Sequence, residues 1–378
     1  MKIAHLSDLH LGKRVNGFSM VPDQKYILEQ ILTIIRDEQA NAVVIAGDVY
    51  DKSVPSAEAV ELFDSFLTGL SQTGADIFVI SGNHDSAERI AFGGELFRRA
   101  GVFLSPVYDG TVTCVEKEDE YGTVCFHLLP FIKPVHVRTR FPEAVIENYS
   151  DALETALSVC DLAEDKRHIL LTHQLVTGAE RSESEDISVG GSENVDAEVF
   201  SGFDYVALGH LHRPQNVGTN LRYCGTPLKY SFSEANHEKS VTMVELGAKG
   251  DVRIRAVPLK PLHDMKRIRG TYLELTARSY YKDTDLQDRY LHVTLTDEED
   301  IPDAIGRLRA VYPYIMNLEY DNRRTRQDQN PLEEAVTPES SPLELFSLLY
   351  EKQNNAPMDT EEVRIIRSLM ARIWEEDV

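Results

Sequence analysis

The chain has 378 residues, with 42% hydrophobic and 27% charged side chains, a composition typical of a globular protein long enough for two domains. No apolar run approaches the roughly 20 residues that span a bilayer, and the N-terminus has no signal-peptide pattern, so we expect a cytoplasmic protein. The net charge of −23 argues against strong unaided binding to nucleic acid, because contacts from Lys and Arg to phosphate dominate such binding.

The cysteine pattern argues against a zinc ribbon. The sequence has four cysteines, and no two of them form a C-x-x-C pair: Cys114, Cys125, Cys160 and Cys224. Structural zinc sites need clustered Cys or His ligands. We therefore predict four free thiols in a reducing compartment.

Strand and helix patterns alternate over the first 261 residues or so. Residues 26–35 and 58–70 carry apolar side chains at helical spacing, and each segment lies between two apolar strands, which predicts βαβ units and a largely parallel inner sheet. Residues 123–129 and 240–246 have no helix between them and their neighbours and predict added antiparallel strands. The expected fold is α/β, a two-sheet sandwich with helices outside.

A second, smaller unit follows, so we place the first domain at 1–265 and an α+β cap at 266–326. Within the cap, residues 271–277, 290–296 and 314–320 alternate as strands do, and residues 305–311 show the pattern of a short helix. Residues 327–341 are polar and contain Pro, which is typical of a linker.

Two amphipathic helices are predicted in the C-terminal tail, residues 342–378. The second has Asp359 as its expected N-cap, with Glu362 three residues later. The apolar residues of the two helices are Leu343, Phe346, Leu349 and Tyr350, then Val363, Ile366, Leu369, Met370, Ile373 and Trp374. Beyond a long linker these faces have little to bury against except each other, which favours a partner-binding helical hairpin over docking onto the protein's own body.

Five apolar strands run directly into Asp, Asn or His. They are KIAHLSDLH (2–10), AVVIAGDVYD (42–51), IFVISGNHD (77–85), HILLTH (168–173) and YVALGHLH (205–212). Ligands bind beyond the carboxyl ends of the strands in open α/β sheets, so these segments predict one polar cluster. A lone Asp or His at such a position is usually a turn residue or a satisfied polar residue, but five such strand ends together indicate a two-metal hydrolytic site.

The expected metal ligands are two carboxylates, one amide and four imidazoles: Asp8, His10, Asp48, Asn83, His173, His210 and His212. One carboxylate can bridge two cations about 3.5–4 Å apart, and Asp48 is the natural bridge. Asp8, His10 and His212 can then complete one metal site. Asn83, His173 and His210 can complete the other. Oxygen and imidazole ligands without a thiolate favour Mn²⁺ or Fe²⁺ over zinc or magnesium, and of the two we expect manganese, as two ions.

These motifs resemble those of the calcineurin-like metallophosphoesterases over the first 212 residues. The further stretches GDVYDKSVPS, VGGSENV, FDYVALGHLHRPQ and YCGTPLKYSFSE are similar to the SbcD family of nuclease subunits, the bacterial counterpart of the eukaryotic meiotic-recombination double-strand-break nuclease. The resemblance implies a four-layer phosphoesterase β-sandwich flanked by helices, with a cap and a helical tail. It also implies that the same seven ligands hold two manganese ions.

The resemblance implies further roles. His84 would contact the scissile phosphate and assist the departing oxygen, and Asp51 matches the position that orients this histidine. The tail would bind an SbcC-like SMC-type ATPase, the substrate would be DNA ends and hairpins, and a homodimer is expected. A small-molecule phosphodiesterase of the same superfamily and a metal-stabilised non-catalytic scaffold subunit are the alternatives. The cap and tail argue against the first, and the complete ligand set with His84 argues against the second.

Overall fold

The computed structural model describes residues 1–180, 182, 193–323, 325, 343, 345–347, 349–350 and 357–375, with side chains to residue 370. The predicted linker, residues 327–341, lies outside this part of the chain, as do the side chains of Ile373 and Trp374 and residues 189–192 of the VGGSENV stretch. Two compact units are present, one made of residues 1–268, 281–293 and 305–317, the other of residues 269–280, 294–304 and 318–378.

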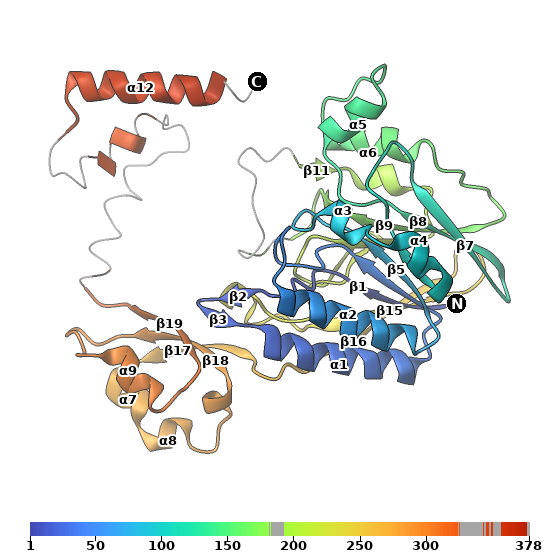
Figure 1. Cartoon of the computed structure of the whole chain (residues 1–378). Helices are drawn as coiled ribbons and strands as arrows, with labels where there is room; N and C mark the ends of the chain where they lie inside the picture. The colour runs from blue at the N-terminus through green and yellow to red at the C-terminus, as the bar shows by residue number, and fades with distance from the viewer. Residues whose placement is uncertain are drawn as a thin grey trace. The chain divides into compact units, whose positions relative to one another are not determined.

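Two six-stranded sheets form the centre of the first unit (Figure 1). The first has the order β16-β15-β1-β4-β5-β6: β16 (Val252–Pro258), β15 (Ser240–Leu246), β1 (Lys2–Leu6), β4 (Ala42–Ala46), β5 (Asp76–Ile80) and β6 (Val102–Leu104). The second has the order β13-β14-β12-β9-β8-β7: β13 (Gln215–Val217), β14 (Leu221–Tyr223), β12 (Tyr205–Gly209), β9 (Arg167–His173), β8 (Gly122–Leu128) and β7 (Thr113–Asp119).

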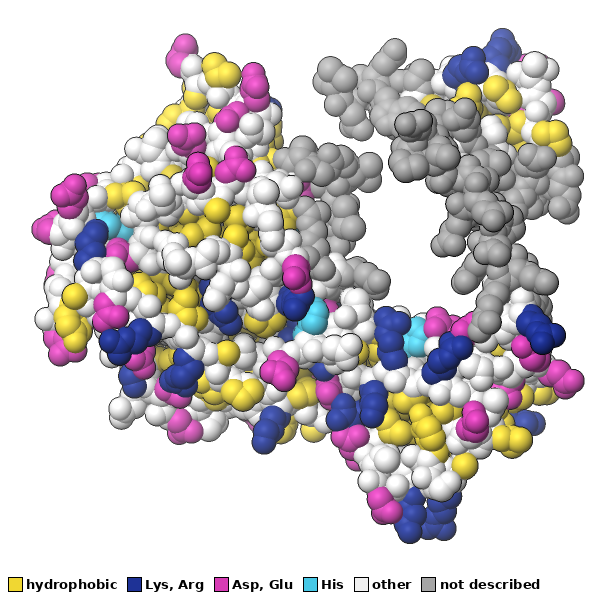
Figure 2. All heavy atoms as spheres, turned by 180° about the vertical axis from the view of Figure 1, so that it is seen from behind, with side chains coloured by type: hydrophobic (Ala, Val, Ile, Leu, Met, Phe, Trp, Pro, Cys, Tyr) yellow, Lys and Arg dark blue, Asp and Glu magenta, His cyan; other side chains and the backbone are white. Residues whose placement is uncertain are grey.

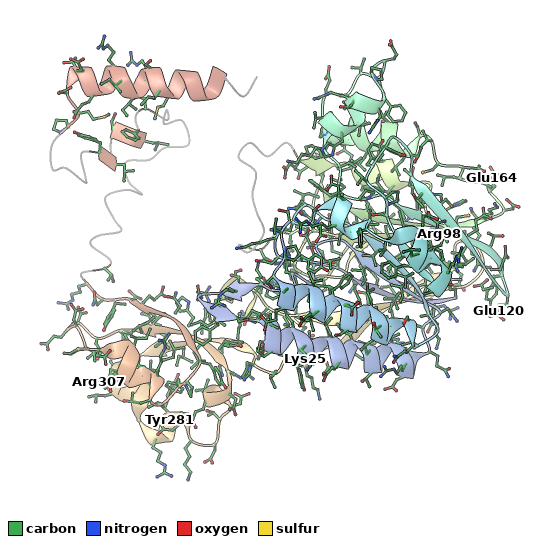
Figure 3. All side chains as sticks on the ribbon, in the orientation of Figure 1. Lys25, Arg98, Glu120, Glu164, Tyr281 and Arg307 are labelled. Carbon is green, nitrogen blue, oxygen red and sulfur yellow. The ribbon has the colours of Figure 1, made fainter. Side chains whose placement is uncertain are left out.

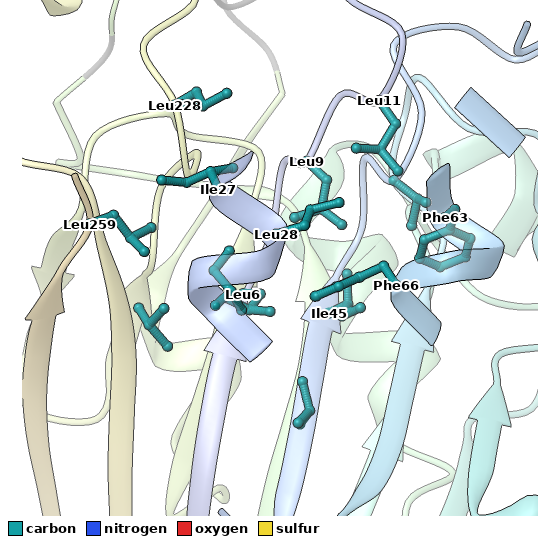
Figure 4. Close-up of a cluster of buried hydrophobic side chains, with 14 of the residues drawn as sticks. Leu6, Leu9, Leu11, Ile27, Leu28, Ile45, Phe63, Phe66, Leu228 and Leu259 are labelled. Atoms are coloured by element: carbon teal, nitrogen blue, oxygen red, sulfur yellow. The ribbon is translucent and has the colours of Figure 1, made fainter. Parts of the chain in front are cut away.

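Helices cover the outer face of each sheet. Buried side chains of α1 (Val21–Glu38) and α2 (Ala57–Ser71) share one apolar cluster with β1, β4 and β5 (Figure 4). Those of α5 (Pro134–Arg140) and α6 (Tyr149–Leu157) share another with β9 and β12. A third cluster, which includes Val44, Phe78, Phe126 and Ile169, joins side chains of the two sheets. The order helix, sheet, sheet, helix confirms the predicted four-layer sandwich.

Most predicted elements of this unit are present, and the strand directions need one correction. The helices expected at 26–35 and 58–70 are the central parts of α1 and α2. Strands β1, β4, β5 and β6 are parallel, as expected, and β15 is antiparallel to β1. The strand predicted at 123–129 is antiparallel to β7 but parallel to β9, because the chain leaves it through α5 and α6 before it returns.

A three-stranded sheet follows, in the order β17-β18-β19: β17 (Met265–Gly270), β18 (Tyr290–Leu295) and β19 (Ile315–Tyr320). The strands predicted at 290–296 and 314–320 and the helix at 305–311, α9 (Ala304–Arg309), are confirmed. The strand predicted at 271–277 is wrong, because α7 (Tyr272–Thr276) forms there. The N–H of Glu274 donates to the Thr271 hydroxyl and the Glu274 carboxylate accepts from Thr271 N–H, a capping box that outweighs the alternation.

The remaining short elements connect these layers. The strands are β2 (Arg14–Val15), β3 (Phe18–Ser19), β10 (Leu175–Val176) and β11 (Asn194–Val195). The helical turns are α3 (Ala87–Ile90), α4 (Gly94–Phe97), α8 (Arg278–Tyr281), η1 (Arg98–Ala100), η2 (Ala197–Phe200), η3 (Phe232–Glu234) and η4 (Leu286–Asp288). Acidic and basic side chains are interspersed on the face seen in Figure 2. No helix in the described part of the chain is long and apolar enough to cross a membrane.

The C-terminal helix α12 (Thr360–Glu375) begins as its sequence predicts. Asp359 Oδ1 accepts from the N–H of Glu362 at 2.8 Å, and the Glu362 carboxylate accepts from the N–H of Asp359 at 2.8 Å. The hydroxyl of Tyr350, from the preceding helical residues, donates to Glu362 Oε1 at 2.6 Å. Ile365 and Leu369 of α12 are 49% and 41% exposed, so apolar surface is left uncovered on this helix.

Candidate metal centre

The candidate ligands gather where strands of both sheets end at their carboxyl termini. Asp8 follows β1, Asp48 follows β4, Asn83 and His84 follow β5, His173 ends β9, and His210 follows β12. Four of the ligand residues have a left-handed backbone, which is uncommon for residues other than glycine: Asp8 (φ 53°), His10 (φ 44°), Asp48 (φ 49°) and His210 (φ 100°). Such strain costs on the order of 1–3 kcal/mol per residue and is concentrated at functional sites.

The Asp48 carboxylate lies at the middle of the cluster. Its Oδ2 is 3.3 Å from His173 Nε2, 3.7 Å from His10 Nε2 and 3.9 Å from His84 Nε2. Its Oδ1 accepts from the His84 backbone N–H at 2.9 Å. One carboxylate that faces imidazoles from three different strand ends has the position expected of a bridging ligand.

Two groups of donors lie on either side of Asp48. In the first, His10 Nε2 and His212 Nε2 are 3.2 Å apart and converge with Asp8. In the second, Asn83 Oδ1 is 2.9 Å from His173 Nε2 and 3.1 Å from His210 Nδ1. The structure therefore brings together all seven residues that the sequence predicts as ligands, in the two predicted groups.

Two glycines allow the strand ends to approach this closely. A Cβ at Gly209 would lie 1.9 Å from the backbone oxygen of Ala46 and 2.6 Å from His173 Nδ1. A Cβ at Gly82 would lie 2.1 Å from Asp48 Oδ1. Any larger residue at either position would displace backbone or a candidate ligand.

The electrostatics of this buried cluster suit divalent cations. Burial lowers the pKa of His210 to about 3 and that of His10 well below its usual range, so both imidazoles are neutral and offer lone pairs. Burial raises the pKa of Asp8 to about 6. Burial also acts against the charged forms of His173 and Asp48, but their mutual attraction raises the pKa of His173 to about 9 and holds that of Asp48 below its usual range.

The donor set fits the divalent ions that this cluster would hold. Two buried carboxylates, an amide oxygen and four imidazoles converge here. Carboxylate, amide and imidazole together suit metals of intermediate hardness.

The surrounding contacts hold several ligands in orientation, and we did not predict them from the sequence. Glu234 Oε1 is 3.2 Å from His212 Nδ1, and Lys239 Nζ donates to Glu234 Oε2 at 2.5 Å. His173 Nδ1 lies 2.8 Å from the backbone oxygen of Ala46. Asp85 accepts backbone N–H bonds from Gly82, Val49 and Tyr50 and so ties two strand ends together. In the sequence, the only indication of this role was that Asp85 is the last residue of the GNHD motif.

His84 lies at the edge of the cluster, with its side chain 22% exposed. Its Nδ1 is 3.1 Å from the backbone oxygen of Asp51. The Asp51 carboxylate pairs instead with Lys13 Nζ at 2.6 Å. The contact of Asp51 with His84 is thus made by its main-chain oxygen, and its role in orienting His84 stays a prediction.

Comparisons with known proteins give the family. A model of the calcineurin-like phosphoesterases matches residues 1–214, and a model described as the type 5 capsule protein repressor C-terminal domain, SbcD_C, matches residues 261–354. The chain belongs to the calcineurin-like phosphoesterase family, and within it to the SbcD proteins.

Two curated relatives cover most of the chain. The SbcD subunit of the SbcCD nuclease from Staphylococcus epidermidis is 35% identical over 84% of this chain and 85% of its own length. The protein of the same name from Staphylococcus saprophyticus is 30% identical over 100% and 99%. A dimetal phosphatase from Danio rerio is 11% identical, with a TM-score of 0.40, over 69% of this chain and 98% of its own.

Proposed function

We propose that the chain is the nuclease subunit of an SbcCD-type complex, which hydrolyses phosphodiester bonds at DNA ends and hairpins. In such a complex it would act as an ATP-dependent double-strand exonuclease and single-strand endonuclease in DNA repair, recombination and replication. The observation that carries the proposal is the Asp48 carboxylate facing His10, His84 and His173 between two groups of donors. The relatives named as parts of the SbcCD nuclease, 30–35% identical to this chain, supply the substrate class.

The candidate centre divides into ligands and a proton donor. Asp48 would bridge two ions, with Asp8, His10 and His212 on one and Asn83, His173 and His210 on the other. The chemistry that such ions supply when bound is a nucleophile from water and neutralisation of charge on the phosphate oxygens. We propose manganese, because neither thiolates nor an all-oxygen shell are among the described donors.

His84 would act at the leaving oxygen. Its Nδ1 is held by the Asp51 backbone oxygen, and its Nε2 faces the centre 3.9 Å from Asp48 Oδ2. A carbonyl oxygen only accepts, so Nδ1 carries the N–H of that contact. In the imidazolium form of His84, the second proton, on Nε2, would be positioned for donation to the departing oxygen, and a positioned acid of this kind contributes typically 10²–10⁴-fold.

The partners follow the same proposal. We assign residues 1–265 to the nuclease domain, 266–326 to a DNA-capping domain, 327–341 to a linker and 342–378 to helices that bind an SbcC-like ATPase. The exposed Ile365 and Leu369 on α12 and the Tyr350–Glu362 hydrogen bond support a helical hairpin with an apolar face. We also propose a cytoplasmic homodimer.

Nuclease activity on linear and hairpin-ended duplex DNA tests the proposal. We expect Mn²⁺-dependent cleavage by the wild type that increases with the cognate ATPase and ATP. His84→Gln should keep its bound metal and lose 10²–10⁴-fold in rate, whereas the control His136→Gln, an exposed histidine on α5, should match the wild type.

Three results would contradict parts of the proposal. Hydrolysis of small phosphodiesters without DNA cleavage would indicate a small-molecule phosphodiesterase. Metal occupancy without hydrolysis, even with the ATPase present, would indicate a scaffold subunit. Loss of metal in His84→Gln would show that His84 is a ligand.

A further inference from the structure

A second group of potential metal ligands lies on the outer face of the β7–β8 hairpin. Cys114 of β7 is directly opposite His127 of β8, and Glu116 is directly opposite Cys125. Residues two apart on a strand share a face, so both cysteines and the histidine project to the same side. One ligand atom from each of Cys114, Cys125 and His127 lies within 4.8 Å of the others. In Figure 3, Glu120 marks the turn of this hairpin.

The histidine of this group has an unsatisfied nitrogen. His127 is 1% exposed, and its Nδ1 has no hydrogen-bond partner among the residues that the structure describes. Its other nitrogen, Nε2, is 3.0 Å from His168 Nδ1. A buried polar atom without a partner costs about 1–3 kcal/mol, so a ligand on Nδ1 would satisfy this nitrogen.

The neighbouring contacts decide which nitrogen carries the proton. His168 Nε2 lies 3.0 Å from the backbone oxygen of Ala163, and a carbonyl can only accept, so this nitrogen is the donor. In a neutral His168, Nδ1 then accepts, and His127 Nε2 donates to it. Burial lowers the pKa of His127 to about 4. The free Nδ1 therefore presents a lone pair.

This arrangement is that of a metal-binding histidine, in which the N–H of one ring nitrogen donates to a fixed acceptor while the other ring nitrogen coordinates the metal. We propose that Cys114, Cys125 and His127 bind one zinc ion, at a site separate from the phosphoesterase centre. Two thiolates and an imidazole are ligands typical of zinc, whereas the phosphoesterase centre offers oxygen and imidazole donors.

Access and electrostatics are consistent with this site. Cys114 is exposed, so an ion can enter without opening the sheet. Burial raises the pKa of the Cys114 thiol to about 12, and the nearby Cys125, Glu116 and Cys160 act in the same direction. A bound divalent cation would stabilise the thiolate and so offset the raised pKa, since cysteine thiols release their protons when a metal binds.

A fourth ligand is available from the same face. Glu116 Oε1 is 3.9 Å from Cys125 Sγ and also accepts from Lys166 Nζ at 2.6 Å. Ligand atoms around tetrahedral zinc are roughly 3.3–3.8 Å apart, given bonds of about 2.0–2.3 Å. The ion would join the two strands of the hairpin.

Zinc content and cobalt spectroscopy test the proposal on the full-length chain. Asp48→Asn should remove the ions of the phosphoesterase centre but retain one equivalent of zinc. Reconstitution of this variant with Co²⁺ should give the near-ultraviolet absorption of thiolate bound to cobalt. We expect Cys114→Ser and Cys125→Ser to lose both the zinc and the absorption, and the control Cys224→Ser to keep both.

Several outcomes would overturn the proposal. One is the absence of thiolate absorption in wild type titrated with Co²⁺ under reducing conditions. Another is absorption that survives both Cys114→Ser and Cys125→Ser. A Cys114–Cys125 disulfide in protein purified with zinc and without reductant would also overturn it. Since Cys114 is exposed, its variant should fold, and retained Mn²⁺-dependent hydrolysis would establish that it does.

Discussion

Glu234 gives the sharpest test of how the candidate centre is supported. Its carboxylate is fully buried between Lys239 Nζ, at 2.5 Å, and His212 Nδ1, at 3.2 Å. Burial opposes its ionisation, but Lys239 and His212 hold the pKa of Glu234 well below the usual range. Glu234→Gln would remove the charge at nearly constant volume and leave the buried Lys239 ammonium without its counter-ion.

The size of the effect follows from these contacts. Loss of one partner from a buried ion pair costs about 3–5 kcal/mol. Lys239 Nζ also donates to Thr226 Oγ1 at 2.7 Å and to the backbone oxygen of His212 at 2.8 Å, so we expect the free energy of unfolding to fall by about 3 kcal/mol, the lower end of that range. Metal affinity should fall about 10–100-fold, because the charged acceptor that fixes the His212 ring is replaced by a weaker, neutral amide.

A second variant separates stability from metal binding. Glu234→Gln combined with Lys239→Met removes both charges and should recover more than half of the lost stability, since a buried ion pair can be replaced by apolar groups with little cost. It should not recover metal affinity. The matched control is Glu38→Gln, which breaks the more exposed Arg255–Glu38 pair and should cost under about 1 kcal/mol.

Urea unfolding in EDTA and calorimetric Mn²⁺ titration would measure the two effects. The reasoning fails if Glu234→Gln destabilises no more than Glu38→Gln. It also fails if the double variant is less stable than the single one, or if its metal affinity returns to the wild-type value.

Three further predictions concern other parts of the chain. Gly209→Ala should abolish metal binding, because its Cβ would lie 1.9 Å from the backbone oxygen of Ala46. The control Gly218→Ala, with no atom within 4 Å of its Cβ, should lower the free energy of unfolding by only about 1 kcal/mol. Metal analysis and urea unfolding would measure the two effects, and retained metal in Gly209→Ala would contradict the prediction. Asp48→Asn should lower Mn²⁺ occupancy at both positions by mass spectrometry, and loss of only one ion would contradict the bridging role. Asp119→Asn should cost about 3 kcal/mol at pH 7, because Asp119 pairs with the buried Arg167. Burial opposes its ionisation, but the Arg167 hydrogen bond holds the pKa of Asp119 below its unfolded value of about 3.9, so this stability is full above that value and is lost as pH falls. The difference in urea midpoint between wild type and Asp119→Asn should therefore be smaller at pH 3 than at pH 7, and an equally large difference at both pH values would refute the assignment.

The sequence by itself determined the seven candidate ligands and the helices and strands around them. Parallel strands bring their carboxyl ends to one edge, so Asp8 and Asp48 could be placed together from their positions after apolar strands alone. The N-cap of α12 could also be predicted from the sequence, because Asp359 and Glu362, which form it, are only three residues apart.

Only the tertiary structure decided what depends on contacts between distant segments or on a local competition. Residues 271–277 alternate as a strand does, yet the Thr271–Glu274 capping box forms a helix there. Asp51 reaches His84 through its backbone oxygen, which no side-chain pattern reveals. Glu234 is 22 residues from His212 in sequence, and the two come into contact only in the folded chain.

The cysteines show the same limit. Ten residues separate Cys114 from Cys125 in the sequence, so the pair lacks the short spacing of a zinc-binding motif. The pairing register of β7 and β8 places them beside His127, and the contact with His168 leaves one nitrogen of that histidine unpaired. Strand register and the orientation of a buried imidazole are set by packing over the whole domain, so spacing along the chain could not supply them.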